Sequence, residues 1–158
     1  MTKNLLLLKK FTHKQLGTKW SEVPLVNPGR FMRISEMMRE EAQTVFLYKD
    51  DGAIIDKLIE DGVPITDMRA LDYSEYFSTI FDDSVYTVTS KYLYIFNIGT
   101  ELARSTEYSD KVLHKLVQHN KNAGNTTIIV SDYYNGTTFT EKYSVTSQLA
   151  DIKLQVIR

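Results

Sequence analysis

The hydrophobic and polar positions of this chain follow two different periods, which predict strands and helices in alternation. Short continuous apolar runs predict buried strands at residues 44–48, 63–68, 92–97 and 126–130, and strict alternation predicts an edge strand at 152–157. Apolar residues at helical spacing predict helices at residues 35–43, 53–61, 71–81 and 105–122, with one helical turn at 146–150. Strands that alternate with helices imply right-handed crossovers, so we predict an α/β fold. It is a three-layer αβα domain around a mostly parallel five-stranded sheet.

Turn and capping residues limit several of these elements. Gly62 and Gly124 are expected to end the second and fourth helices, because glycine readily adopts the left-handed conformation found after a helix. Asp72 or Ser74 is expected to cap the start of the third helix. These signals make the helix ends easier to place than the helix starts.

Composition is that of an ordinary globular protein. The chain has 158 residues, 42% of them hydrophobic and 25% charged, which is enough for one domain with a sizeable core. A net charge of −1 gives no global basic field, and the absence of cysteine excludes a disulfide scaffold and a Cys nucleophile. The apolar run at Leu5–Leu8 is too short for a signal peptide or a membrane span, so we expect a cytoplasmic protein. We divide the chain into an N-terminal arm or extension at residues 1–32 and an α/β domain at residues 33–158.

The N-terminal arm carries a local positive charge. Its basic residues near the single tryptophan, Trp20, are Lys9, Lys10, Lys14 and Lys19. This group could contact the phosphate backbone of single-stranded DNA, or an acidic partner. The alternative is a solvated arm in which Trp20 is a local packing anchor.

The stretch from Tyr92 to Glu101, YLYIFNIGTE, is an apolar run that ends at the polar residue Asn97. In nucleotide-binding α/β proteins, ligands lie at the carboxyl end of such a buried strand. From Thr44 to the C-terminus, segments in the right order and spacing resemble the AAA+ ATPase domain of the DnaC/DnaI helicase loaders and their IstB relatives. They are Val45–Tyr48 (the strand before the P-loop), Lys57–Pro64 (the end of the P-loop helix), Met68–Ala70 (the second strand), Leu93–Glu101 (the Walker B strand), Lys111–Asn122 (the next helix), Thr126–Tyr133 (the sensor 1 strand) and Thr146–Leu149 (the closing Ser-Arg-Leu motif). The resemblance covers about two-thirds of the chain and implies a P-loop NTPase/AAA+-like core.

The resemblance breaks at the phosphate-binding loop. A P-loop is glycine-rich and ends in Gly-Lys-Ser/Thr, because backbone N–H groups and the lysine hold the phosphates and the hydroxyl binds Mg²⁺. Here the first predicted strand is followed by Lys49, Asp50, Asp51 and Gly52, and Gly-Lys-Ser/Thr does not occur in the chain. The loop and helix together are about two helical turns, roughly seven residues, shorter than those of the family. Two aspartates in place of phosphates also disfavour polyphosphate binding.

The other catalytic positions that the resemblance implies have also changed. Phe96 and Asn97 stand where the family has the Walker B acids, which hold Mg²⁺ and orient water. Asp132 stands at the sensor 1 position, which is usually Asn, and Gln148 replaces the arginine of the closing motif. We therefore expect a degenerate nucleotide site, no catalytic residue and no cofactor, which makes the protein a pseudo-ATPase.

A metal site has little support in the sequence. His114 and His119 are five positions apart on a predicted helix, which does not place them on one face as a spacing of four would. No Gly-x-Ser-x-Gly motif and no Ser/His/Asp arrangement is visible. We interpret the histidines as solvated helix residues.

Three functions follow from these observations. The first is a non-catalytic protein that docks onto a replicative helicase, a helicase loader or a related AAA+ subunit, in an oligomer or alone, in the replication system of a phage or mobile element. The second is an active ATPase with an atypical loop, in which Lys49, Asp50, Asp51 and Asp132 would bind ATP and Mg²⁺. The third is a single-stranded DNA-binding replication accessory that uses the Lys-rich arm.

Overall fold

The computed structural model describes residues 3–5, 38–48, 50–79, 88–99, 106–131, 142–149 and 152–155. Strands and helices alternate along these residues, and neighbouring strands of the sheet pair in parallel. The elements are β1 (Thr44–Tyr48), α3 (Ala53–Glu60), the 3-10 turn η2 (Ile65–Asp67), β2 (Met68–Asp72), α4 (Tyr73–Thr79), β3 (Tyr92–Ile98), α5 (Thr106–Asn122), β4 (Thr126–Ser131), α7 (Ser144–Ser147) and β5 (Ile152–Gln155). The predicted α/β class and parallel sheet are therefore confirmed.

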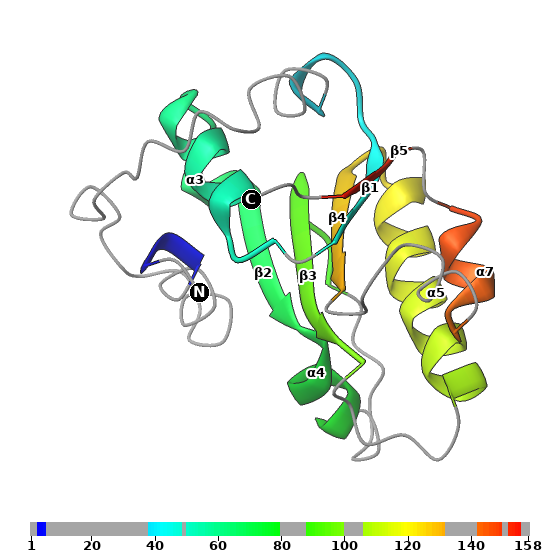
Figure 1. The fold of residues 1–158 in the computed structure, drawn as a ribbon. Coiled ribbons are helices and arrows are strands. Elements are labelled where there is room, and N and C mark those ends of the chain that lie inside the picture. The colour runs from blue at the N-terminus through cyan, green and yellow to red at the C-terminus, as the bar shows by residue number, and fades with distance from the viewer. Residues whose placement is uncertain are drawn as a thin grey trace.

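The strands lie in the order β2-β3-β4-β1-β5 (Figure 1). The body of the sheet is β2-β3-β4-β1, and the short strand β5 pairs with β1 at the edge. The chain therefore crosses from β1 to the far edge at β2, and then returns through β3 and β4 to β5. Because all the strands are parallel, their carboxyl ends lie at one edge of the sheet, which we call the carboxyl edge.

Each face of the sheet packs against its own apolar cluster. Alternate strand residues supply the two clusters, because successive side chains of a strand point to opposite faces. Val45 and Tyr94 lie in the cluster under α3, whereas Phe46 and Ile95 lie in the cluster under α4 and α5. Figure 1 shows α3 on one side of the sheet, with α5 and α7 on the other. These strands are buried on both faces, which explains their continuous apolar runs.

A helical turn from the N-terminal region packs against the α3 side of the sheet. Lys3–Leu5 are helical, and Leu5 is 1% exposed within the apolar cluster under α3. The Asn4 amide donates a hydrogen bond of 2.6 Å to Oδ1 of Asp56, and both side chains are buried. This turn therefore joins the core of the α/β domain.

Two predicted elements need correction. The second strand was predicted at 63–68, but the structure has the 3-10 turn η2 at Ile65–Asp67 and begins β2 only at Met68. The third helix accordingly begins at Tyr73 instead of residue 71, because Leu71 and Asp72 belong to β2. The apolar run at 63–68 was misleading because only its last residue, Met68, lies in a strand, whereas Ile65–Asp67 form the 3-10 turn. The segment matched to the second strand by resemblance, Met68–Ala70, does lie in β2.

The first predicted helix is also shorter than expected at its end. Residues 38–40 are helical, and the helix stops before 43. Residues 35–37 lie outside the described residues. Among the residues that the structure does describe, none of the helices combines the length and the apolar composition needed to cross a lipid bilayer.

Candidate functional site

Three residues of the site predicted from the sequence, Asp50, Gly52 and Asn97, lie at the carboxyl edge. In open α/β sheets, ligands bind at this edge where neighbouring strands send the chain to opposite faces. That point here lies between β1 and β4, because the chain leaves β1 for α3 on one face and leaves β4 for α7, which packs with α5 on the other (Figure 1). The loop after β1 is therefore where a ligand of this fold class would be expected.

Asp50 occupies this loop with a buried side chain. It is 7% exposed, and its Oδ2 accepts a hydrogen bond of 2.6 Å from the hydroxyl of Tyr94. The same oxygen accepts a second hydrogen bond of 3.1 Å from the backbone N–H of Gly52. The Tyr94 hydroxyl also lies 3.3 Å from the carbonyl oxygen of Asp50. The loop is therefore fastened to β3 through its own carboxylate.

The carboxylate of Asp50 lies at the N-terminal end of α3, where backbone N–H groups favour an anion. Gly52 precedes α3 and has a φ of 108°, a left-handed conformation that glycine adopts without strain. The first backbone N–H groups of a helix have no partners within the helix, and they attract anions together with the helix dipole. In a P-loop these donors hold phosphate. Here the N–H of Gly52 is bonded to Asp50, so a side chain of the protein serves as the anion.

Burial governs the ionisation of both partners. It raises the pKa of Asp50, and the negative charge of Asp51 raises it further, while the hydrogen bonds from Tyr94 and Gly52 act in the opposite direction. Burial also raises the pKa of Tyr94 well above 10, and the charge of Asp50 adds to this effect. Tyr94 therefore keeps its proton and remains a hydrogen-bond donor at neutral pH.

The end of β3 contains a β-bulge. Ile95 pairs with Ile129 of β4, but Ile98 pairs with Ser131, so β3 has one residue more than its partner across this interval. Asn97 lies in the bulge with a φ of 59°, a left-handed conformation that Asn tolerates better than most residues. The extra residue shifts the alternation, and Ile98 consequently packs on the same face as Ile95.

Asn97 and Asp72 connect the carboxyl ends of β3 and β2. The Asn97 amide donates a hydrogen bond of 2.8 Å to Oδ2 of Asp72. The other carboxylate oxygen of Asp72 accepts a hydrogen bond of 3.2 Å from the backbone N–H of Glu75, which caps α4 as predicted. Asn97 therefore has a structural role at the position matched to a Walker B acid.

A third carboxylate caps α7. Asp110 of α5 is 3% exposed and accepts hydrogen bonds from the backbone N–H groups of Val145 (2.9 Å) and Thr146 (3.0 Å). The Thr146 hydroxyl donates a further hydrogen bond of 2.6 Å to Oδ1 of Asp110. Asp50, Asp72 and Asp110 thus each occupy the N-terminal end of a different helix.

The other predicted site residues that the structure describes lie in different surroundings. Phe96 is 4% exposed and packs in the apolar cluster under α3, with its ring centroid 5.9 Å from that of Tyr94. Asp51 is exposed, and Gln148 is exposed at the end of α7, on the opposite side of the sheet from α3. Lys49 and Asp132 lie outside the described residues.

The predicted nucleic-acid contacts also lie outside the described residues. These are Lys9, Lys10, Lys14, Lys19 and Trp20. In the described part of the chain, His, Asp and Glu side chains form no group of three or more that could hold a metal ion.

Tyr94 is the member of the site that the sequence did not reveal. The strand pattern places it on the same face as Phe96, but nothing local indicates that its hydroxyl reaches the loop after β1. The available signal was chemical, because a tyrosine in the middle of a buried strand needs a partner for its hydroxyl.

No protein-family model matches this chain, and no curated protein sequence matches it. Its function is therefore inferred from the geometry of the carboxyl edge and from the resemblance of its segments.

Proposed function

We propose that this protein is a non-catalytic relative of the AAA+ helicase loaders. It would act by binding a replicative helicase, a helicase loader or a related AAA+ subunit, without binding or hydrolysing ATP. The P-loop NTPase/AAA+-like identity of its core is part of this proposal.

The order of the strands supports the proposed ancestry. The segments that resemble the P-loop strand, the sensor 1 strand and the Walker B strand are β1, β4 and β3, which are neighbours in the sheet. A P-loop ATPase site is built from the loops that follow these strands, so their carboxyl ends must lie together. The order β3-β4-β1 meets this requirement.

The observation that carries the loss of activity is the buried carboxylate of Asp50. A phosphate bound at the start of α3 would have to displace the hydrogen bond of 3.1 Å between Asp50 and the N–H of Gly52. It would also be repelled by the carboxylate itself, which Tyr94 fixes in place. At the other half of the site, Asn97 is bonded to Asp72 and Phe96 is buried, so neither is presented to Mg²⁺.

Nucleotide binding tests the non-catalytic half of the proposal. A ligand that binds only the folded state raises its stability by about 2.7 kcal/mol when present at a hundred times its Kd. We expect millimolar Mg-ATP to leave the melting temperature unchanged, and Mg-ADP to behave in the same way. A Tm increase of several degrees with Mg-ATP, or measurable phosphate release by the purified protein, would establish the ATPase alternative instead.

Capture from the native host tests the partner. We expect the tagged protein to retain a replicative helicase, its loader or another AAA+ subunit, whereas the tag alone does not. The interaction should then be reproduced by mixing the two purified proteins and observing co-elution in size-exclusion chromatography. If the purified helicase, the loader and the other AAA+ subunits of the host's replication system all elute separately from this protein, the proposed function is wrong.

A further inference from the structure

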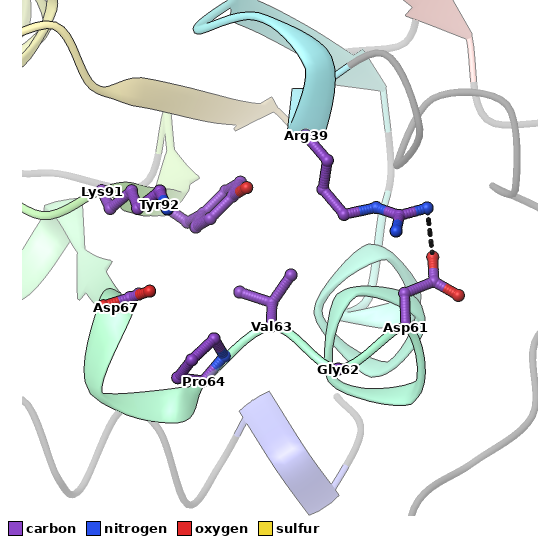
Figure 2. A pocket seen from close by; sticks show the side chains of 8 residues that line it. All are labelled: Arg39, Asp61, Gly62, Val63, Pro64, Asp67, Lys91 and Tyr92. Atoms are coloured by element: carbon purple, nitrogen blue, oxygen red, sulfur yellow. Dashed lines mark ion pairs between the residues drawn. The ribbon is translucent and has the colours of Figure 1, made fainter.

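A polar pocket lies at the amino edge of the sheet, opposite the carboxyl edge that holds Asp50. Its volume is about 240 Å³. The lining residues precede β1, follow α3 or begin β2 and β3: Arg39, Asp61, Gly62, Val63, Pro64, Asp67, Lys91 and Tyr92. Figure 2 shows Val63 and Pro64 on one side of the space, with Arg39 crossing the opposite side towards Asp61. No part of the proposed function uses this pocket.

Tyr92 presents an unsatisfied hydroxyl to the pocket. The residue is only 4% exposed, and among the described residues no group forms a hydrogen bond with its hydroxyl. Figure 2 shows the ring of Tyr92 and the carboxylate of Asp67 both directed into the space. The hydroxyl opens into the pocket, where it can donate a hydrogen bond to a bound group or accept one from it.

The charges around this hydroxyl have both signs. Burial raises the pKa of Tyr92, the positive charge of Arg39 lowers it and the negative charge of Asp67 raises it, so both charges lie near the hydroxyl. Arg39 is paired with Asp61 at 3.4 Å, and Lys57 also binds Asp61 at 2.9 Å. Arg39 and Asp61 both line the pocket, so the ion pair between them forms part of its wall.

Lys91 and Asp67 carry charges that form no ion pair with another described residue. Asp67 is held in place by its backbone, since its carbonyl oxygen accepts a hydrogen bond of 2.8 Å from the Ser90 hydroxyl. Among the described residues, the pocket is therefore lined by an ammonium (Lys91) and a carboxylate (Asp67) without ion-pair partners, and by a hydroxyl (Tyr92) that can donate or accept a hydrogen bond.

We propose that this pocket binds a compact zwitterion, such as a free amino acid. The ligand's carboxylate would pair with Lys91 and accept a hydrogen bond from Tyr92, its ammonium would pair with Asp67, and its apolar carbons would lie against Val63 and Pro64. A ligand of one charge alone would pair with only one of these two charged side chains and leave the other to water. The volume of about 240 Å³ lies below the range of roughly 300–1,000 Å³ found for drug-sized ligands, which suits a ligand as small as an amino acid.

Isothermal titration calorimetry with the full chain tests the ligand class. The probes are the individual L-amino acids, with β-alanine and γ-aminobutyrate to vary the distance between the two charges. For each probe that binds, the N-acetyl derivative removes the ammonium and the amide derivative removes the carboxylate. We expect at least one free amino acid to bind and both of its blocked derivatives to bind at least tenfold more weakly. Absence of binding by all the free amino acids, or equal binding by a blocked derivative, would overturn the proposal.

Variants then test the residues. Tyr92→Phe and Asp67→Asn each remove one hydrogen bond to a charged ligand group, and we expect each to weaken binding by about ten- to a hundredfold. The matched controls are Tyr108→Phe and Glu107→Gln, which alter exposed residues of α5 on the other side of the sheet and should bind like the wild type. Unchanged melting temperatures would show that the variants fold. Wild-type affinity in folded Tyr92→Phe and Asp67→Asn would place the ligand elsewhere and contradict the proposal.

Discussion

At the scale of single residues, polar side chains of the carboxyl edge pair with one another and with the backbone. Asp50 supplies the negative charge at the start of α3, and Tyr94 supplies the donor that fixes it. Asn97 combines a left-handed backbone conformation with a hydrogen bond to Asp72, which explains why an amide suits this position. Each of these residues is accounted for by contacts within the chain.

The buried carboxylate of Asp50 predicts a specific pH dependence of stability. Folding raises the pKa of Asp50, so the folded state keeps this proton at pH values where the unfolded state has lost it. The contribution of Asp50 to stability is therefore largest below about pH 4 and is lost as the pH rises through the folded pKa. Asp50→Asn removes this titration while keeping an acceptor for Tyr94 and Gly52.

We expect the stability of Asp50→Asn relative to the wild type to increase between pH 4 and 7. The increase should be about 1.4 kcal/mol for each unit by which folding raises the pKa of Asp50. Urea denaturation at several pH values measures the difference, and Glu41→Gln, which removes an exposed carboxylate, is the control. Parallel stability curves for Asp50→Asn and the wild type would show that Asp50 is not held as described.

At the scale of elements, three helices have their N-terminal ends closed by carboxylates of the chain. Asp50 serves α3, Asp72 serves α4 and Asp110 serves α7. Asp50 comes from the loop that leads into its own helix, Asp72 is the last residue of β2, and Asp110 comes from α5. Helix N-termini are the usual anion sites of α/β proteins, and at these three ends a carboxylate of the chain accepts hydrogen bonds from the backbone.

The contact between Asp110 and α7 predicts a large effect of one substitution. Asp110→Ala would leave the backbone N–H groups of Val145 and Thr146 and the hydroxyl of Thr146 without this acceptor. Losing the buried cap should destabilise the protein by about 2–3 kcal/mol, measured by urea denaturation. Glu107→Ala, one turn earlier on α5 and exposed, should change stability by less than about 0.5 kcal/mol. A similar small effect for Asp110→Ala would mean that α7 does not depend on α5.

The sequence allowed the strands and helices with unbroken patterns to be predicted, and failed where a position depended on the rest of the sheet. The limits of β1 matched the prediction, and α3 and α5 ended within one residue of theirs, because Gly62 and Gly124 close them in left-handed conformations. The strand β2 begins later than predicted because Ile65–Asp67 form the 3-10 turn η2 before it. Asp50 and Asn97 could be chosen as site residues, but the contact between Tyr94 and Asp50 depends on the order of β3, β4 and β1, which local sequence does not encode.

At the scale of the whole molecule, the N-terminal turn packs with the α/β domain. Leu5 belongs to the apolar cluster under α3, and Asn4 is bonded to Asp56 of that helix. The helix is consequently buried on more than its sheet-facing side, since Asp56 is fully buried and Lys57 is 6% exposed. Removal of the first residues would therefore uncover α3, the helix whose start carries Asp50.

Because Leu5 packs in the core, its truncation should destabilise the whole domain. Leu5→Ala should destabilise the protein by about 2–4 kcal/mol in urea denaturation, because it removes a side chain that is 1% exposed. Val145→Ala, which shortens a side chain that is 39% exposed, should change stability by less than about 0.5 kcal/mol. If Leu5→Ala is as mild as this control, the N-terminal turn does not contribute to the core. If Leu5→Ala is strongly destabilising, a deletion that removes Leu5 would reduce oligonucleotide binding merely by unfolding the domain.

The Lys-rich arm should then be tested by replacing Lys9, Lys10, Lys14 and Lys19 with Gln in the full chain and measuring the salt dependence of binding.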